Sequence, residues 1–190
     1  FFLGHAYSFY ATKNITTGEG GMLLTSNENL AIEVRRKRNQ GMESTYDYKT
    51  IGFNNRLTEI QAALGLSQLK VLPRYTELRR RQAQIYDARL NSCVQSQREE
   101  GPQSVHHQYT VKVESRDEVM RELENHGIPT RIFYPRPLSS LSHFQNQEPL
   151  PKSEEFSSKC LSLPIGPHLG DKQIIFIAER LNDILERNSQ

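Results

Sequence analysis

Lys13 lies in the stretch of this sequence whose residue types and spacing best support covalent chemistry. It follows the Ser8 hydroxyl by five residues and precedes the run Gly-Glu-Gly-Gly at 18–21. A hydroxyl can bind an anion, glycines allow a close approach of the backbone, and a partly desolvated lysine amine can form a Schiff base with a carbonyl. An enzyme that uses pyridoxal phosphate needs this combination. The same spacing also fits a surface lysine in a turn.

Short strands at 7–10 and 22–25 are expected to hold this lysine between them. Asn27 is a good N-cap, and a mostly solvated helix is expected to run from it to Gly41, followed by a polar, aromatic loop over 42–55. The strongest helical pattern begins at Leu57 and continues to about Asn91. Its first apolar positions predict one apolar face, and they are Leu57, Ile60, Ala63, Leu64, Leu66 and Leu69.

That long helix is expected to be interrupted or restarted at Pro73. The pattern changes at about residue 92, where alternating apolar residues predict a strand over 105–113. Ser115 and Glu118 have capping-box spacing and predict a helix that ends at Gly127. A strand at 128–134, a proline-punctuated loop, and helices at 152–160 and 172–187 complete a small α+β pattern.

Composition restricts the class of protein. The chain has 190 residues, of which 36% are hydrophobic and 24% charged, with a formal net charge of +2. The hydrophobic fraction is low for a globular domain, but the charged fraction is ordinary and does not indicate a disordered chain. The longest apolar stretches are far below the roughly 18 residues that cross a bilayer. No signal peptide is visible, and no membrane partner is expected.

Metal and nucleic-acid chemistry have little support. Cys93 and Cys160 form no disulfide framework and fit no zinc spacing, so two free thiols in a cytoplasmic setting are expected. The six histidines share no ligand spacing, so no metal site is predicted. The basic runs at 35–38 and 79–81 read as solvated helix faces, and no nucleic-acid partner is expected.

Four blocks of residues occur in an order that is specific to one family. Segment 8–21 reads Ser-Phe, three residues, Lys, four residues and Gly-Glu-Gly-Gly, and segment 52–63 reads Gly-Phe-Asn-Asn-Arg-Leu-Thr-Glu-Ile-Gln-Ala-Ala. The third block joins Gly-Ile-Pro-Thr at 127–130 to Tyr-Pro-Arg-Pro-Leu at 134–138, and the fourth is Leu-Pro-Ile at 163–165. Across essentially the whole chain, these blocks resemble the sugar aminotransferases of the DegT–StrS group, which are pyridoxal phosphate enzymes of fold type I.

The resemblance implies an α/β fold that is the C-terminal part of a fold type I transferase. Residues 1–75 would be a remnant of the large cofactor-binding domain, with the lysine loop and the connecting helix. Residues 76–190 would hold the rest of the long helix and the small α+β C-terminal domain. The implied reaction moves an amino group, from an amino-acid donor such as glutamate, to a nucleotide-linked keto-sugar.

Roles for individual residues also follow from the resemblance. Lys13 would bind pyridoxal 5'-phosphate covalently and then move a proton as base and acid. Ser8 would bind the cofactor phosphate, and Asn54 would reach the phosphate in a neighbouring subunit, so a homodimer is expected. Tyr134 is a candidate for substrate binding, although packing is an alternative role for it. Ser139 stands where the family often has histidine, which leaves the sugar contacts open.

One part of the family's site is missing from the sequence. The carboxylate that pairs with the cofactor's pyridine nitrogen precedes the lysine block in this family, but the 12 residues before Lys13 contain no Asp or Glu. We therefore expect the 190-residue chain alone to be incomplete, and weakly active or inactive. The alternative is a non-catalytic truncated relative that acts as a dimerisation or partner-binding module.

Overall fold

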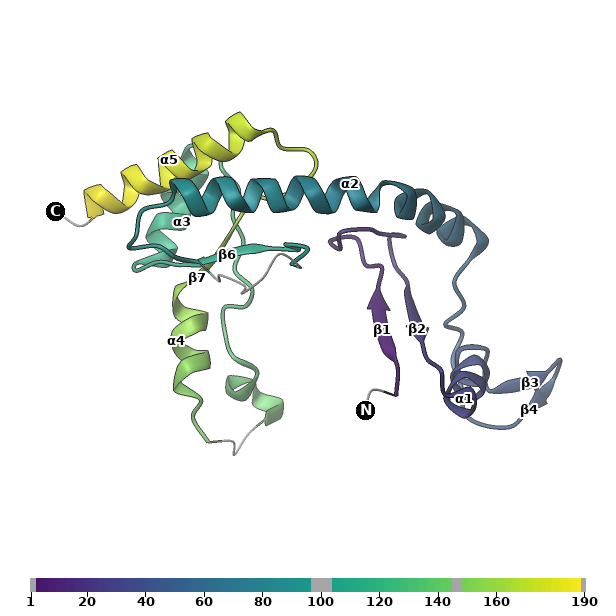
Figure 1. Ribbon diagram of the computed structural model, residues 1–190. Helices are drawn as coiled ribbons and strands as arrows, with labels where there is room; N and C mark the ends of the chain where they lie inside the picture. The colour runs from purple at the N-terminus through teal and green to yellow at the C-terminus, as the bar shows by residue number, and fades with distance from the viewer. Residues whose placement is uncertain (1–2, 97–103, 145–147, 189–190) are drawn as a thin grey trace. The chain divides into compact units, whose positions relative to one another are not determined.

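The computed structural model describes residues 3–96, 104–144 and 148–188. The chain divides into two compact units, Phe1–Pro73 and Arg74–Gln190. Figure 1 shows small strand pairs in the first unit and a three-stranded sheet with helices in the second. Helix α2, Glu59–Arg89, gives its first half to one unit and its second half to the other.

The first unit begins with an antiparallel strand pair. Strand β1, His5–Ser8, pairs with β2, Gly21–Leu24, and Ser8 lies opposite Gly21 in the register. β2 lies close to its expected position, whereas β1 begins and ends two residues earlier than expected. The reason is local, because the chain turns at Tyr10, where the carbonyl accepts a 3.0 Å hydrogen bond from the Lys13 amide.

Helix α1, Glu28–Arg38, begins as the sequence predicts. The Asn27 side chain accepts a 3.0 Å hydrogen bond from the Leu30 amide, which is the N-cap contact expected of this residue type. The segment that follows was expected to be a loop, but part of it forms a hairpin. Its strands are β3, Met42–Ser44, and β4, Asp47–Tyr48.

Two glycines allow the chain after this hairpin to pack against the end of α1. Gly41 has a φ of 81°, and a Cβ at Gly52 would overlap the backbone nitrogen of Gly41. No larger residue fits at such a backbone crossing. The Phe53 amide then donates to the Lys37 carbonyl at 2.7 Å, which ties the segment after Gly52 to α1.

Helix α2 corrects two expectations. It has 31 residues and continues through Pro73, so the expected interruption is wrong. A proline removes one hydrogen bond of the helical ladder, and the remaining turns carry the helix past it. The expected single apolar face is also wrong, because residues nine positions apart, such as Ile60 and Leu69, lie about 180° apart around a helix.

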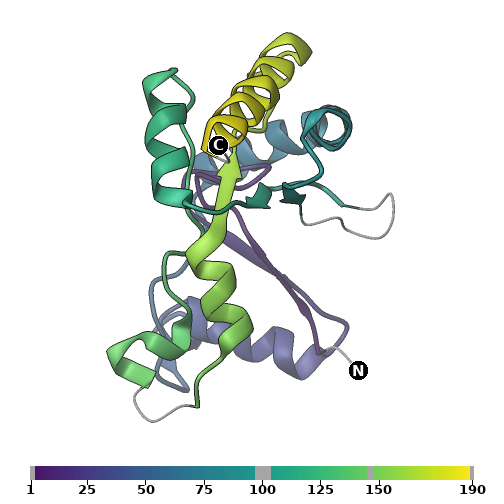
Figure 2. The same ribbon diagram turned by 90° about the vertical axis from the view of Figure 1, so that its left-hand side faces the viewer.

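The second unit is built on a three-stranded antiparallel sheet. Strand β6, Tyr109–Lys112, lies between β5, Gln95–Ser96, and β7, Cys160–Leu163. Helices α3, Arg116–Asn125, and α5, Asp171–Asn188, lie side by side next to this sheet (Figures 1 and 2). The core of this unit is apolar and also includes residues of the second half of α2; its fully buried members include Tyr86, Val111, Leu123, Leu161, Ile174, Leu181 and Ile184.

The second unit also departs from the sequence pattern in several places. Ser115 precedes α3 with a φ of 47° and makes no side-chain cap bond, so the predicted capping box is wrong. The segment at 128–134 forms only an isolated bridge, between Arg131 and Ser162 of β7, and β7 itself was not predicted. Helix α4, Pro151–Lys159, lies near its expected position, and the 3-10 turns Leu138–Ser140 and Ser142–Phe144 occupy the proline-punctuated loop.

Candidate active site around Lys13

Lys13 sits in the loop that joins β1 to β2. The loop is closed at its base by the Phe9 amide, which donates to the Gly20 carbonyl at 2.8 Å, and by the Thr17 amide, which donates to the Phe9 carbonyl at 3.0 Å. The Tyr10 amide lies 3.4 Å from the Ser8 hydroxyl, which accepts its hydrogen bond. Ser8 and Lys13 therefore belong to one hydrogen-bonded loop, and the side chains of both are exposed.

Backbone geometry explains two of the glycines in the loop. Gly18 has a φ of 81°, a left-handed conformation that favours glycine. A Cβ at Gly20 would lie 2.6 Å from the Thr17 hydroxyl and 2.9 Å from Leu57 Cδ1. The glycines are therefore needed for the shape that presents Lys13.

Thr17 and Gln61 anchor this loop to α2, a role that was not predicted for either residue. Thr17 is buried, its hydroxyl donates to the Glu19 carbonyl at 2.6 Å, and Gly65 lies against its methyl group. The Gln61 side-chain amide donates to the same Glu19 carbonyl at 3.0 Å. The Gln-Ala-Ala run at 61–63 was the part of the sequence that could have indicated this contact, because Gln61 is the residue of α2 that binds the lysine loop.

Asn54 lies outside this loop. It forms an antiparallel bridge with Asn39 at the end of α1, and its side chain is exposed. The neighbouring Arg56 donates to Asn39 Oδ1 at 2.6 Å, and the Asn55 amide donates to the Arg38 carbonyl at 2.9 Å. The segment that carries Asn54 is therefore held firmly against α1, with the Asn54 amide directed to solvent.

Tyr134 and Ser139 belong to the second unit. Tyr134 is 69% exposed, and its ring packs edge to face on Phe133 with the ring centroids 5.6 Å apart. Ser139 lies in the 3-10 turn Leu138–Ser140. Packing on Phe133 covers only part of the Tyr134 ring, and the rest of the ring is exposed to solvent.

The donor set around Lys13 fits pyridoxal phosphate in part. A primary amine and a hydroxyl stand exposed on one glycine-shaped loop, which suits a carbonyl compound that carries a phosphate. The pyridine nitrogen needs a carboxylate, and Glu19 is the only acidic residue of the 9–20 loop, with its backbone carbonyl already held by Thr17 and Gln61. The residues present therefore fit the aldehyde and phosphate ends of the cofactor, and leave the ring nitrogen without a partner.

Two hollows in the first unit lie beside α1. One of about 390 Å³ is lined by β2 and by Arg35 and Arg38, and another of about 590 Å³ by Arg36, Arg56 and Glu43 among others. Arg36 is ion-paired with Glu43. Basic side chains at the C-terminal end of a helix are favoured by the helix dipole. That effect accounts for this basic cluster without a ligand.

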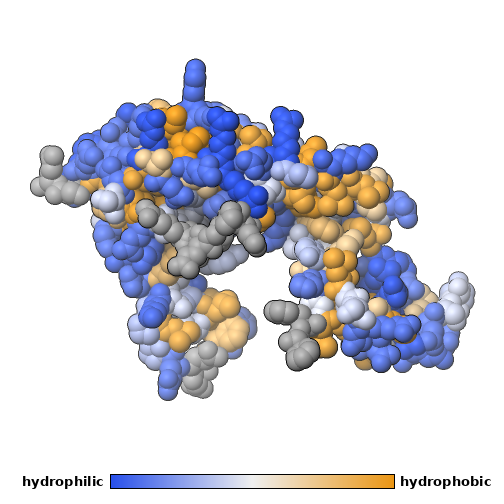
Figure 3. Space-filling view, viewed as in Figure 1, coloured by the Kyte–Doolittle hydropathy of each residue, from blue (hydrophilic) through white to orange (hydrophobic). Residues whose placement is uncertain are grey.

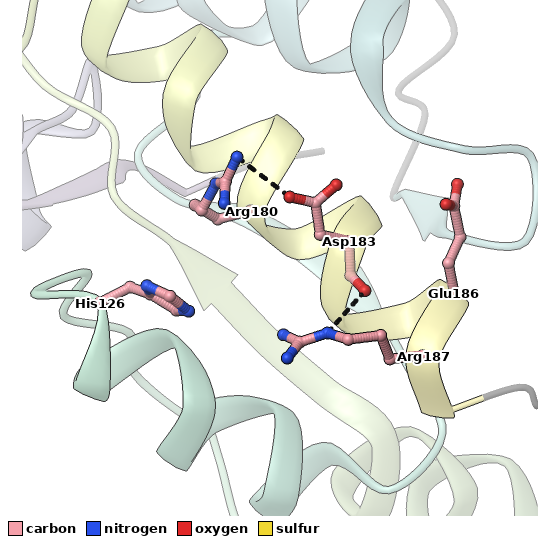
Figure 4. A pocket seen from close by; sticks show the side chains of 5 residues that line it. All are labelled: His126, Arg180, Asp183, Glu186 and Arg187. Carbon is pink, nitrogen blue, oxygen red and sulfur yellow. Dashed lines mark hydrogen bonds and ion pairs between the residues drawn. The ribbon is translucent and has the colours of Figure 1, made fainter.

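A further hollow, of about 440 Å³, lies on the second unit between α3 and α5 (Figure 4). Its cations already have partners: Arg180 pairs with Asp183 at 3.0 Å, and Arg187 with Glu122 at 3.1 Å. The Arg187 Nε also donates to the Asp183 carbonyl at 3.2 Å. The two arginine charges of this hollow are therefore paired within the chain, and the Glu186 carboxylate accepts a hydrogen bond from the Asn91 side-chain amide at 3.0 Å.

The described part of the chain has neither a metal-binding cluster nor a membrane-spanning helix. Within it, no three His, Cys, Asp or Glu side chains are grouped where they could hold a metal ion. None of its helices combines the length and apolar composition needed to cross a membrane. Both cysteines are free thiols, as expected, with Cys93 exposed and Cys160 buried.

Comparisons with known proteins agree with this geometry. The sequence model of the DegT/DnrJ/EryC1/StrS aminotransferase family matches residues 3–182. The chain is 35% identical to a "Pleiotropic regulatory protein" of Geobacillus stearothermophilus, covering 92% of this chain and 50% of that protein. It is also 35% identical to the UDP-N-acetyl-3-dehydro-alpha-D-glucosamine 3-aminotransferase of Acidithiobacillus ferrooxidans, covering 90% of this chain and 48% of that protein.

The fold comparison gives the same result. The crystal structure of S. venezuelae DesV in complex with a ketimine intermediate matches with a TM-score of 0.91 and 33% identity, over 97% of this chain and 52% of that one. The expected fold class is thereby confirmed as a mixed α/β part of a pyridoxal phosphate-dependent transferase, consistent with the C-terminal part. The chain spans about half the length of the curated relatives it matches.

Proposed function

We propose that this chain, which belongs to the DegT/DnrJ/EryC1/StrS aminotransferase family, supplies the lysine half of a sugar aminotransferase. Members of this family depend on pyridoxal phosphate. The proposed reaction transfers an amino group from an amino acid, such as glutamate, to a keto-sugar attached to a nucleotide. The name of the Acidithiobacillus ferrooxidans relative, a UDP-sugar aminotransferase, supports a nucleotide-sugar substrate. We call the half of the family polypeptide that this chain does not match the complementary half.

Lys13 and Ser8 are the residues that would hold the cofactor. The Lys13 amine is a nucleophile for the aldehyde carbon, and the Ser8 hydroxyl can donate a hydrogen bond to a phosphate oxygen. When bound, pyridoxal phosphate supplies an electron sink that makes a substrate carbon acidic enough to lose a proton. The complementary half would provide the carboxylate for the ring nitrogen.

Lys13 would have a second task, which is to move a proton. With its amine free, Lys13 would be a base that could accept the proton from the substrate carbon and return it to a neighbouring atom. Such a transfer works best where water is excluded. Since the Lys13 side chain is exposed in this chain, the complementary half or a second subunit must exclude the water.

Asn54 would act across a dimer. Its exposed side chain stands on a segment whose backbone is held against α1, so it could reach a cofactor phosphate in a neighbouring subunit at little cost in backbone order. A homodimer is proposed for this reason. The exposed Tyr134 is the candidate for substrate contact from the second unit.

The single observation that carries the proposal is Lys13 on a glycine-shaped loop in a chain that matches the family over residues 3–182. The test is Lys13→Ala in the chain joined to a complementary half, with amino transfer from glutamate to a nucleotide-linked keto-sugar as the assay. Loss of at least about 1,000-fold in rate is expected, because no other group would perform both tasks. Lys172→Ala, at an exposed lysine of the second unit, is the matched control. Unchanged transfer by Lys13→Ala would refute the proposal.

A second candidate function is an assembly module without catalysis of its own. The observation that favours it is that the chain covers about half of its relatives. The intact lysine block opposes it. In that case the chain joined to a complementary half would form its normal assembly, but neither the unchanged protein nor the Lys13→Ala variant would transfer an amino group. The expected cytoplasmic setting stays a prediction.

A further inference from the structure

Helix α2 begins with a capping box, in which the residue before the helix and the third residue of the helix bond to each other's backbone. The Gln61 amide donates to the Thr58 hydroxyl at 3.2 Å, and the Thr58 amide donates to Gln61 Oε1 at 2.9 Å. The Thr58 hydroxyl donates to the same oxygen at 3.0 Å. The Gln61 side chain is therefore held by its oxygen, and the two protons on its nitrogen are left for another contact.

The nitrogen of the Gln61 side chain binds the lysine loop. It donates to the Glu19 carbonyl at 3.0 Å, and the Thr17 hydroxyl donates to the same carbonyl at 2.6 Å. A carbonyl oxygen has two lone pairs and can accept both bonds. The end of the loop that follows Lys13 is thereby tied to the first turn of α2.

The neighbours of Gln61 on α2 are apolar. Segment 60–66 reads Ile-Gln-Ala-Ala-Leu-Gly-Leu, so Gln61 is its one polar side chain. Figure 3 shows apolar residues gathered over this part of the helix. Glutamine is found mostly on solvated, polar surfaces. Its presence in an apolar run is explained by the contact that it makes with the lysine loop.

Two further contacts seat the loop on the same side of α2. A Cβ at Gly65, one turn after Gln61, would lie 3.1 Å from the Thr17 methyl carbon. A Cβ at Gly20 would lie 2.9 Å from Leu57 Cδ1, one turn before Gln61. Thr17 is only 4% exposed. The loop therefore rests on three positions of α2 that are spaced by four residues, with Gln61 in the middle.

Backbone hydrogen bonds lead from this seat to Lys13. The Gly20 carbonyl accepts from the Phe9 amide at 2.8 Å, and the Phe9 carbonyl accepts from the Thr17 amide at 3.0 Å. The next residue is Tyr10, whose carbonyl accepts from the Lys13 amide at 3.0 Å. A displacement of the seat would pass through the two bonds at Phe9 to the turn that carries Lys13.

We propose that Gln61 is a positioning residue for Lys13. Its side-chain oxygen caps α2 and its side-chain nitrogen fixes the lysine loop, so one amide sets the place of the Lys13 amine relative to the helix. This inference rests on the proposed function, because it gives Gln61 a part in the reaction of Lys13 with the cofactor.

The role needs glutamine rather than glutamate. Glutamate also completes a capping box, and its negative charge is favoured at the N-terminal end of a helix. A carboxylate accepts hydrogen bonds but cannot donate them, so it would turn an acceptor toward the Glu19 carbonyl. Gln61→Glu should therefore keep the cap of α2 and lose the contact with the loop, which separates the two tasks of the side chain.

The first test is backbone hydrogen exchange in the chain joined to a complementary half (the joined protein). In Gln61→Glu, the amides of Phe9 and Thr17 should exchange about 10-fold faster, the size expected for one lost hydrogen bond. The Ala62 amide, which donates to the Thr58 carbonyl at 2.9 Å, should stay protected because the cap remains. Unchanged exchange at Phe9 and Thr17 would overturn the proposal, and so would faster exchange confined to Ala62.

The second test is the rate at which added pyridoxal phosphate, trapped with borohydride, labels Lys13 in the joined protein. Gln61→Glu should lower this rate, and kcat for amino transfer, by about 10-fold and leave KM for the keto-sugar unchanged, because it misplaces the amine without touching the substrate. Labelling of Lys172 should not change. Gln84→Glu makes the same chemical change at an exposed position of α2 and is the matched control.

The outcomes separate this inference from the proposed function. Equal rates of Lys13 labelling in Gln61→Glu and Gln84→Glu would overturn the positioning role. A joined protein that is not labelled at Lys13 at all would refute the proposed function. The exchange of the Phe9 and Thr17 amides would even then confirm or overturn the anchoring of the loop by Gln61.

Discussion

At the residue scale, the predictable features are those that the local chain decides. Asn27 caps α1 because the bond it makes lies within three residues of it. Lys13 could be predicted as a site residue because the residues that shape its loop are close to it in the sequence. Thr17 and Gln61 could not, since their contacts depend on where α2 lies. The role proposed for Lys13 rests on motif and chemistry, whereas its surroundings depend on residues distant in the sequence.

Tyr86 gives a prediction of pH dependence. Burial, with a smaller contribution from Tyr109, raises the pKa of Tyr86 far above its usual range, so the folded state keeps the neutral phenol. This stabilisation is complete below the unfolded pKa of about 10 and is lost as the pH rises above it, because only the unfolded chain ionises there. The free energy of unfolding should therefore fall by up to about 1.4 kcal/mol per pH unit above pH 10 from this group.

The measurement is urea unfolding, followed by circular dichroism, between pH 8 and pH 11. Tyr86→Phe should lose this contribution to the slope. At pH 7 it should cost about 1 kcal/mol, because the Pro164 carbonyl loses the hydrogen bond that the hydroxyl donates at 2.7 Å. Tyr46→Phe, at a tyrosine 81% exposed, is the control. Identical slopes for Tyr86→Phe and the unchanged protein would contradict the prediction.

Gln82 gives a prediction of stability. Its buried side-chain amide donates to the carbonyls of Gly166 and Leu169 at 2.9 and 2.8 Å and accepts from the Gly166 amide at 2.9 Å. Gln82→Leu should cost at least about 2 kcal/mol, because buried backbone groups lose their partners. Gln84→Leu, at an exposed position two residues along the same helix, should change stability little. Equal thermal unfolding midpoints for the two variants would refute this.

At the element scale, helix positions could be predicted better than strand positions. α1, α3, α4 and α5 lie near their expected ranges because apolar spacing and terminal residues act locally. β7 was missed because it is only four residues long and directly follows α4, so its sequence pattern is too short to mark a strand. A strand was expected at 128–134, but the strand that pairs with β6 on this side of the sheet is β7. Whether a helix continues through a proline depends on the helical turns on both sides of it. The position of Pro73 in the sequence does not show that α2 continues through it.

Gly52 gives a prediction at this scale. Gly52→Ala should push the segment that carries Asn54 away from α1, because the added Cβ would overlap the Gly41 backbone. Amides of Phe53 and Asn55, which donate to Lys37 and Arg38 at 2.7 and 2.9 Å, should then exchange faster in the joined protein. Gly170→Ala is the control, since a Cβ there meets its nearest atom at 3.8 Å. Unchanged exchange at both amides in Gly52→Ala would show that the crossing tolerates a side chain.

At the scale of the whole molecule, the buried apolar residues are unevenly distributed between the two units of the described chain. The second unit has a compact core of its own, whereas the first exposes its apolar residues, so the core expected of 190 residues is only partly present. Family, fold class and half-length correspondence could be predicted from four blocks of residues. The concentration of the core in one unit could not, since it depends on which apolar residues find partners.

The central claim is that Lys13 binds pyridoxal phosphate. The most direct measurement adds pyridoxal phosphate to the chain joined to a complementary half, reduces the protein with borohydride and maps the labelled peptide by mass spectrometry. We predict that the phosphopyridoxyl label is found on Lys13, and that Lys13→Ala leaves the protein without a preferred site. A label spread over the exposed lysines, with Lys13 no more modified than Lys172, would contradict the account.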